Sequence, residues 1–241
     1  MPPLDPELLL RAYAAGVFPM ADSHDAPSVY WVEPKERAIL PLDDFHLSRS
    51  LKKTLLSERF KTTANQAFSE IVALCAESAD NRPDTWINHQ IAHVVDVLHR
   101  AGHAHSIETW RDGELVGGLY GISLGNAFFG ESMVSRATDA SKVALAHLLA
   151  RLRCGGFMLL DCQFMTDHLQ SMGAVEVSRE SYMALLAVAV GGASGSSAGL
   201  SAGADFRAFE RIPAPEGSAD STTVLGPTSG WRIVQALTHT S

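Results

Sequence analysis

The fold is decided by one stretch, residues 127–163, which reads AFFGESMVSRATDASKVALAHLLARLRCGGFMLLDCQ. It begins with an apolar strand that contains Glu131 and ends with a second apolar strand, 157–162, that contains Asp161. Between the two strands, leucines at helical spacing predict an amphipathic helix at 141–154, which a glycine pair ends. The stretch therefore predicts a β-α-β unit built around one long helix.

The flanking sequence extends this unit into a larger sheet. Residues 105–111, 114–123 and 127–133 are predicted strands in close succession, separated by turn residues at 111–114 and 123–126. The remaining predicted elements are helices at 67–75, 87–101 and 181–190 and a strand at 174–177. By analogy this is the element order of GNAT-type acyltransferases. We predict an α+β fold: a GNAT-like domain whose mixed sheet has helices on both faces.

The sequence changes character twice, which predicts three regions. Residues 1–60 are expected to form a small N-terminal α+β domain, with helices at 7–15 and 47–56 and strands at 29–31 and 37–41. Residues 61–190 form the GNAT-like domain, and 191–241 begin with a Gly/Ser/Ala-rich run. That composition predicts a flexible tail with at most one weak docking segment.

Composition favours a protein of the reducing cytoplasm. The 241 residues are 46% hydrophobic and 19% charged, and include three widely spaced cysteines without a zinc or disulfide pattern. We expect neither a secretory signal nor a membrane span, because no apolar run approaches about 20 residues. The net charge of -8 argues against a partner held mainly through phosphates. However, residues 49–61 are locally basic, as either a solvated helix face or an anchor for a polyanion.

Two short stretches with polar residues interrupt the apolar strands, at residues 130–133 and 161–163. A dehydrated carboxylate costs free energy unless it is paired or performs chemistry. Glu131 and Asp161 therefore predict either an active site formed by neighbouring strands, or helix caps and internal ion pairs.

The chain resembles the leucyl/phenylalanyl-tRNA–protein transferases in short motifs that occur in order over roughly residues 7–190. The motifs are AYAAGVFPM (12–20), WVEP (31–34) followed by Arg37, FHLSRSL (45–51), TWI (85–87), HAHSIE (103–108), LVGGLYG (115–121), GESM (130–133), ASK (140–142) and DCQ (161–163). The chain departs from the family pattern at Val134, where Phe is usual, and at Asp139, where Asn is usual. Val134 is therefore expected to reshape the pocket that selects the amino acid.

The resemblance implies an enzyme that moves Leu or Phe, and less well Met, from aminoacyl-tRNA to proteins with N-terminal Arg or Lys. Such transfer creates a destabilising N-terminus for the N-degron pathway. The resemblance also implies a monomer without a cofactor. Residue by residue, it assigns Asp161 and Gln163 as the catalytic pair, Glu131 as the contact to the transferred amino group, and Trp86 as the contact to the aminoacyl end of the tRNA. Met133, Trp31 and Glu108 are further candidates for substrate contacts.

The chemistry suits these residue types. Aminoacyl-tRNA is an activated ester, so attack by an amine needs neither ATP nor a metal. The attacking α-amino group has a pKa of about 7.7–8.0 and is partly protonated at neutral pH. We expect Asp161, with its pKa raised by burial, to act as general base. Gln163 lies two residues on, where its amide could accept from the amine, relay toward Asp161 or donate to the oxyanion.

Substrate recognition leaves several alternatives open. Met133, Val134, Phe128 and Phe129 could line an apolar pocket, or they could be plain core, which is favoured for the two phenylalanines. Glu108 could meet the acceptor's cation or form a structural ion pair. For the tRNA we expect Arg49, Lys52 and Lys53 to contact phosphates, and Trp86 to stack on the terminal adenine.

The sequence allows three alternatives to this family: a CoA-dependent enzyme, an inactive binding protein and a metal-binding protein. A CoA-dependent acetyltransferase needs a glycine-rich loop before the long helix, and residues 135–140 contain no glycine. An inactive RNA- or N-terminus-binding protein is expected to lack the polar pair, which is present. His89 and His93 have a zinc-like spacing, but no third ligand is evident in the sequence, so surface histidines are favoured.

Overall fold

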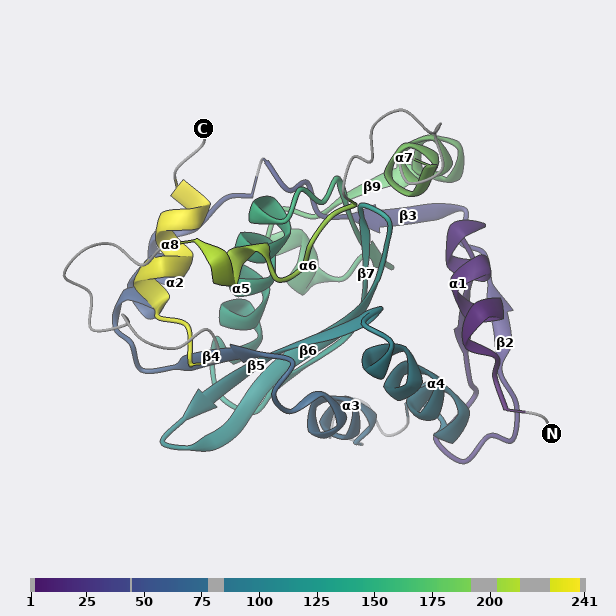
Figure 1. Ribbon diagram of the computed structural model, residues 1–241, viewed down its shortest axis with the longest axis horizontal. Helices are drawn as coiled ribbons and strands as arrows, with labels where there is room; N and C mark the ends of the chain where they lie inside the picture. Colours follow the sequence, from purple (N-terminus) through teal and green to yellow (C-terminus); the bar gives the residue numbers. More distant parts are fainter. Residues whose placement is uncertain (1–2, 44, 78–84, 192–202, 213–225, 239–241) are drawn as a thin grey trace.

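A computed structural model of the chain describes residues 3–43, 45–77, 85–191, 203–212 and 226–238. Its main sheet has seven strands in the order β4-β5-β6-β7-β8-β3-β9, and a small second sheet pairs β1 with β2 (Figure 1). The strands are β1 (Phe18–Met20), β2 (Tyr30–Val32), β3 (Glu36–Ile39), β4 (Lys61–Ala64), β5 (Ala104–Arg111), β6 (Glu114–Leu124), β7 (Ala127–Ser135), β8 (Leu159–Gln163) and β9 (Val175–Ser178). In the main sheet, β7 and β8 are parallel and the other neighbours are antiparallel.

Helices cover both faces of the main sheet. They are α1 (Pro6–Ala14), α2 (Arg49–Leu56), α3 (Phe68–Ala76), α4 (His89–Arg100), α5 (Ala140–Cys154), α6 (Asp167–Ser171), α7 (Arg179–Gly191), the 3-10 helix η1 (Ala208–Arg211) and α8 (Gly230–Thr238). One apolar core contains residues of α1, α3, α4 and α7, and the other contains residues of α2, α5 and α8. The prediction of an α+β fold with a mixed sheet between two helical layers is confirmed.

The pairing of β7 with β8 is short, and this creates the space for a site. The two strands pair only through Ala127–Leu159, Phe128–Leu160 and Phe129–Asp161. Beyond that point β7 continues beside β6, whereas β8 continues beside β3. Residues 130–133 and 162–163 therefore lie on two strands that are no longer paired with each other.

Residues 36–60, expected in the N-terminal domain, contribute directly to the main body. Strand β3 is inserted between β8 and β9, and Leu51 and Leu55 of α2 lie in the same core as α5. The hydrophobic sequence of these short elements did not indicate their place in the sheet, because strand order depends on contacts far apart in the chain. The proposed division at residue 60 stays a prediction.

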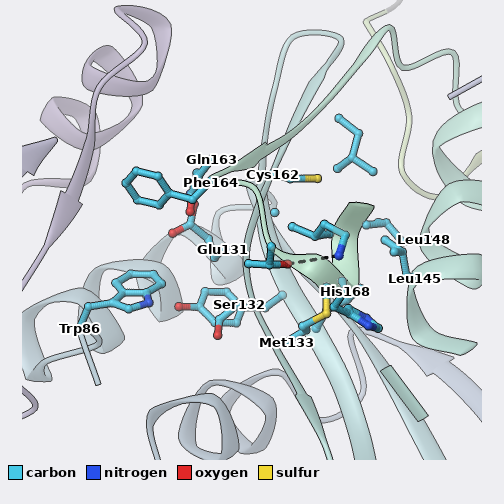
Figure 2. Close-up of a pocket in the computed structure, with 16 residues that line it drawn as sticks. Trp86, Glu131, Ser132, Met133, Leu145, Leu148, Cys162, Gln163, Phe164 and His168 are labelled. Carbon is cyan, nitrogen blue, oxygen red and sulfur yellow. Dashed lines mark hydrogen bonds between the residues drawn. The ribbon is translucent and has the colours of Figure 1, made fainter. Parts of the chain in front are cut away.

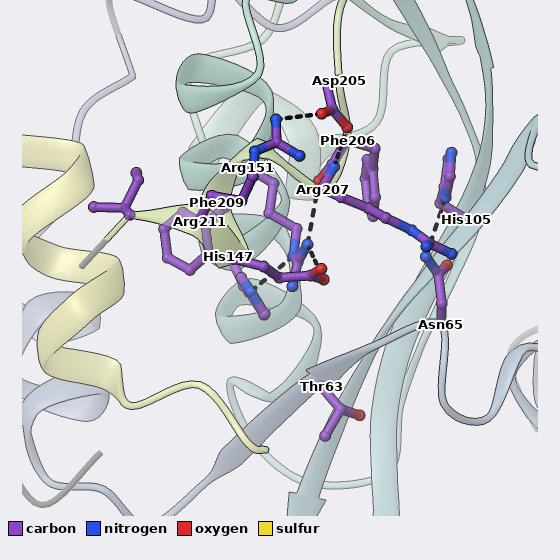
Figure 3. A network of polar contacts seen from close by, with 12 residues as sticks. Thr63, Asn65, His105, His147, Arg151, Asp205, Phe206, Arg207, Phe209 and Arg211 are labelled. Carbon is purple, nitrogen blue, oxygen red and sulfur yellow. Dashed lines mark hydrogen bonds and ion pairs between the residues drawn. The ribbon is translucent and has the colours of Figure 1, made fainter. Parts of the chain in front are cut away.

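The C-terminal region differs from the expected flexible tail wherever the structure describes it. Phe206 and Phe209 are buried, and the guanidinium of Arg151 on α5 lies against both rings. Arg151 Nη1 also donates to the Phe206 carbonyl at 3.2 Å and to Glu210 at 3.0 Å, and Figure 3 shows this network. These contacts explain why Arg151, a charged residue, is buried although the sequence predicts an amphipathic helix with a solvent-exposed polar face. The parts of the expected tail at 192–202, 213–225 and 239–241 lie outside the described residues.

Within the described part of the chain, the helices are all too short or too polar to cross a membrane.

Candidate active site

A cavity of about 520 Å³ opens where β7 and β8 diverge. Gly130, Glu131, Ser132 and Met133 of β7 line it, together with Cys162 and Gln163 of β8. Most of the remaining wall is apolar and comes from β6, α5 and the β8–α6 region; it includes Leu119, Leu145, Leu148, Leu160 and Leu169. In Figure 2, Glu131 and Gln163 lie at one side, while Leu145, Leu148 and His168 lie at the other. The cavity is thus an apolar pocket with a polar end.

Glu131 forms that polar end. Its Oε1 accepts from the Tyr13 hydroxyl at 2.6 Å and from Gln163 Nε2 at 3.0 Å, and within the described residues no hydrogen bond reaches Oε2. Burial raises the pKa of Glu131 to about 7, against the lowering effect of the hydrogen bond from Tyr13. Burial and the neighbouring Glu131 charge raise the pKa of Tyr13, which keeps it a donor at neutral pH. Glu131 therefore offers one carboxylate oxygen to a ligand.

Asp161 lies behind this end of the pocket and is fully engaged by the protein. Arg37 donates to it from Nε at 2.9 Å and from Nη2 at 2.6 Å, forming a buried bidentate pair. The Tyr182 hydroxyl donates to Oδ2 at 2.8 Å, and the Gln163 backbone N–H donates to Oδ1 at 2.8 Å. Both oxygens of Asp161 are therefore acceptors in a closed network.

Arg37 links Asp161 to the N-terminal segment and to α7. Its Nη1 donates to the Gly16 carbonyl at 3.2 Å, and its guanidinium lies 4.6 Å from the ring centres of Phe18 and Tyr182. Burial alone lowers the pKa of Arg37, but the hydrogen bonds and charge of Asp161 outweigh burial and raise it. The guanidinium thus remains charged and satisfied although it is almost completely buried.

A β-bulge directs Gln163 toward the pocket. The register of β3 against β8 shifts between Ala38–Gln163 and Ile39–Asp161, and Gln163 has a left-handed backbone with φ of 63°. A non-glycine residue in this region is strained and is held there by its surroundings. Here the Asp161 carboxylate holds the Gln163 N–H, and the side chain reaches Glu131.

Four of the predicted site residues meet at this cavity: Glu131, Trp86, Met133 and Gln163 all line it. Asp161 does not belong to its lining, although it contacts Gln163. Phe128 and Phe129 are completely buried, one in each core, so the core alternative holds for both. Val134 packs at the edge of the core and is likewise outside the lining of this cavity.

One predicted substrate contact requires correction. Glu108 is completely buried and accepts hydrogen bonds from the hydroxyls of Thr63 and Ser106, so it cannot meet an acceptor cation. Its burial follows from its position on β5, an inner strand whose residues face two helical layers. Trp31 is half-exposed on β2, opposite Pro19, and lies outside the lining of this cavity, so its contact with substrate stays a prediction.

The basic residues expected to contact tRNA lie together on the surface. Arg49, Lys52 and Lys53 of α2 line a shallow depression with Leu56 and Ser57. The other two members of the local basic run are paired, because Arg59 lies 2.9 Å from Asp139 and Lys61 lies 3.1 Å from Glu58. The free positive surface is therefore confined to α2, within this basic run.

Sequence reasoning gave no role to several residues of the site. Tyr13 and Arg37 were motif members only, and Tyr182 was part of an unremarkable helix. His168 was also missed; it lines the pocket, and its buried Nε2 has no hydrogen-bond partner among the described residues. Burial and the charge of Lys142 lower the pKa of His168, so a neutral ring borders the apolar part.

Comparisons with known proteins point to one family. Residues 39–187 match the model of the leucyl/phenylalanyl-tRNA protein transferase, and residues 3–35 match the model of its N-terminal domain. Proteins named leucyl/phenylalanyl-tRNA–protein transferase are similar to this chain, and three of them serve as examples. The Rhizorhabdus wittichii protein is 60% identical over 248 aligned residues, covering 100% of both chains. That of Zymomonas mobilis is 60% identical over 187 residues, or 78% of this chain and 70% of its own. The Paramagnetospirillum magneticum protein is 58% identical over 190 residues, which cover 79% of this chain and 91% of its own.

Among solved structures, the crystal structure of FemX is similar at a TM-score of 0.45 and 12% identity, covering 71% of this chain and 66% of its own.

The buried ion pair makes the first testable prediction. Replacing Arg37→Met leaves the Asp161 charge uncompensated, so the free energy of unfolding should fall by about 3–5 kcal/mol. In the double variant Arg37→Met/Asp161→Asn neither member of the pair is charged, and the loss should be smaller than the sum of the single losses. Urea denaturation of Arg37→Met, Asp161→Asn and the double variant measures the three losses.

The matched control is Arg179→Met, because Arg179 pairs with Glu33 on the surface. Its loss should stay within about 1 kcal/mol. Strictly additive losses for Arg37 and Asp161, or a loss for Arg37→Met no larger than that of the control, would contradict the network described here.

Proposed function

Since the chain belongs to the leucyl/phenylalanyl-tRNA–protein transferase family, we propose that it transfers Leu or Phe to proteins that begin with Arg or Lys. Membership makes the chain an aminoacyltransferase that moves an amino acid from tRNA to a protein. The finer proposal includes Met as a poorer donor and a product that enters the N-degron degradation pathway. It also places the protein in the cytoplasm, as a monomer that needs no cofactor because the donor ester is already activated.

The observation that carries the proposal is the apolar cavity with Glu131 at its polar end. An aminoacyl group has the same division: a cationic α-ammonium beside an apolar side chain. The free Oε2 of Glu131 can accept from the ammonium, while a Leu or Phe side chain fits among Met133, Leu145 and Leu148. Burying that side chain removes apolar surface from water, which selects against polar amino acids.

The reaction is an exchange of an ester for an amide. The acceptor's α-amine attacks the ester carbonyl carbon, the new C–N bond forms, and the C–O bond to the tRNA ribose breaks. The amine loses one proton and the ribose oxygen gains one, so the reaction is balanced without an added reagent. Most of the rate enhancement is supplied by holding the two substrates in contact.

Within this reaction we assign different tasks to the catalytic pair. Gln163 directs its Nε2 to Glu131, and this leaves its amide oxygen to accept from the attacking amine. Asp161 is a positioning residue, because its carboxylate holds the Gln163 backbone while Arg37 and Tyr182 occupy its remaining acceptor sites. This replaces the expectation that Asp161 itself removes the proton.

The tRNA is proposed to reach the pocket past Trp86 and to contact the exposed cations of α2. Trp86 lines the pocket, so its indole can stack on the terminal adenine. Arg49, Lys52 and Lys53 can neutralise a few phosphates, which suits an enzyme that must release tRNA in every cycle. The net charge of -8 favours an acceptor that begins with a cationic residue.

An acyl-CoA donor is disfavoured by the N-terminus of α5. The residue that precedes α5 is Asp139, in a left-handed conformation with φ of 72°, and its carboxylate is bound by Arg59 and Lys142. A pyrophosphate placed at that helix end would meet a carboxylate, and this opposes the usual attraction of anions to a helix N-terminus.

The proposed activity is tested with labelled Leu-tRNA and two peptides that differ only at the first residue, Arg or Ala. Without CoA or ATP, the label should pass to the Arg peptide at least about tenfold faster, since a cation-selective site typically contributes a kcal/mol or more. Equal transfer to both peptides would overturn the acceptor rule. Absence of transfer by the folded protein would overturn the activity itself.

The role of Glu131 is tested with Leu-tRNA and N-acetyl-Leu-tRNA, which lacks the ammonium. The wild type should prefer Leu-tRNA, and Glu131→Gln should lower kcat/KM for Leu-tRNA about 10- to 100-fold while leaving the acetylated donor nearly unchanged. The control is Glu114→Gln, an exposed carboxylate at the start of β6. If Glu131→Gln slows both donors equally, Glu131 does not bind the ammonium.

A further inference from the structure

Three potential metal ligands meet at a site that the proposed reaction does not use. His24 and Asp25 lie in the loop after β1, and His89 is the first residue of α4. One ligand atom from each residue lies within 4.8 Å of the others, and the rings of His24 and His89 are 4.6 Å apart. For His89 and His93 the sequence favours surface histidines, and in the structure the residues that lie beside His89 are His24 and Asp25.

The ring of His24 is anchored by a backbone carbonyl. Its Nδ1 lies 3.1 Å from the carbonyl oxygen of Ile87. A carbonyl can only accept, so Nδ1 must carry the hydrogen of this bond. In the neutral ring the lone pair is then on Nε2. This backbone contact is the one that commonly fixes the tautomer of a metal-binding histidine.

The other two ligands are close and free to adjust. His89 Nε2 lies 4.0 Å from Asp25 Oδ1, and the two side chains are 78% and 91% exposed. Zinc bonds of about 2.0–2.2 Å in a tetrahedral site place neighbouring ligand atoms roughly 3.4 Å apart. The group therefore has to contract by about an ångström, which exposed side chains achieve by small rotations.

We propose that His24, Asp25 and His89 bind a divalent transition-metal ion of the zinc class, with water completing the coordination. Two imidazoles and one carboxylate suit zinc, nickel or copper, whereas magnesium and calcium prefer sites made of oxygen ligands. His93 is not a ligand in this site.

The bound ion would strengthen the connection between two segments that support the pocket. Ala21 N–H already donates to the Trp86 carbonyl at 3.1 Å, and Asn88 Nδ2 donates to the Ala26 carbonyl at 2.9 Å. Trp86 lines the pocket, and His89 follows it by three residues. A metal at this position therefore stabilises the loop and the start of α4 together, next to the pocket wall.

The test is calorimetric titration of the untagged full-length chain with zinc after removal of metal by a chelator. The wild type should bind one zinc, and His24→Ala and His89→Ala should each weaken binding about 10- to 100-fold. His93→Ala is the matched control, one turn along α4, and should bind like the wild type. Magnesium should give no binding.

A second readout separates this site from zinc bound by the cysteines, Cys75, Cys154 and Cys162. Zinc should raise the Tm of the wild type and of His93→Ala equally, and should raise the Tm of His24→Ala much less. Equal zinc affinity in His24→Ala and wild type would overturn the proposal. So would the absence of wild-type binding at about 100 µM zinc, a concentration that saturates ordinary three-ligand sites.

Discussion

The architecture of the site depends on the buried ion pair between Arg37 and Asp161. Arg37 also reaches the Gly16 carbonyl and lies against the rings of Phe18 and Tyr182, so one guanidinium connects the N-terminal segment, β3, β8 and α7. Two charges this deeply buried are tolerated only when their hydrogen-bonding groups are satisfied, as they are here. Because Asp161 in turn holds the strained backbone of Gln163, the ion pair determines where the amide of Gln163 lies.

The second constraint is the divergence of β7 and β8 after three paired residues. It opens an apolar cavity inside a sheet that is otherwise packed on both faces, and it leaves Glu131 dehydrated at the edge of that cavity. Dehydration raises the pKa of Glu131 to about 7, whereas the hydrogen bonds from Tyr13 and Gln163 act in the opposite direction. A ligand ammonium supplies the positive charge that this carboxylate lacks. Pocket shape and pocket charge therefore arise from the same strand geometry.

Much of the fold was predictable because its decisive contacts are local. The meander β5–β7, helix α5 and strand β8 follow one another in the chain, and their hydrophobic periods are clear. Within the site, Glu131 was found because it sits in a short polar interruption of a strand, whereas the role of Gln163 came from the family resemblance. Arg37 was not assigned a role, since its partner is 124 residues away and no local pattern reveals such a contact.

The predictions that failed have the same origin: the sequence left the burial of Glu108 on an inner strand open, and it did not reveal that Phe206 and Phe209 of the expected tail are buried against α5. The most direct measurement is a crystal structure with 3′-(leucylamino)-3′-deoxyadenosine, a stable amide analogue of the aminoacyl end of tRNA. The account predicts the leucyl side chain among Met133, Leu145 and Leu148, with its ammonium hydrogen-bonded to Glu131. An analogue bound outside this cavity, or with its ammonium directed away from Glu131, would contradict it.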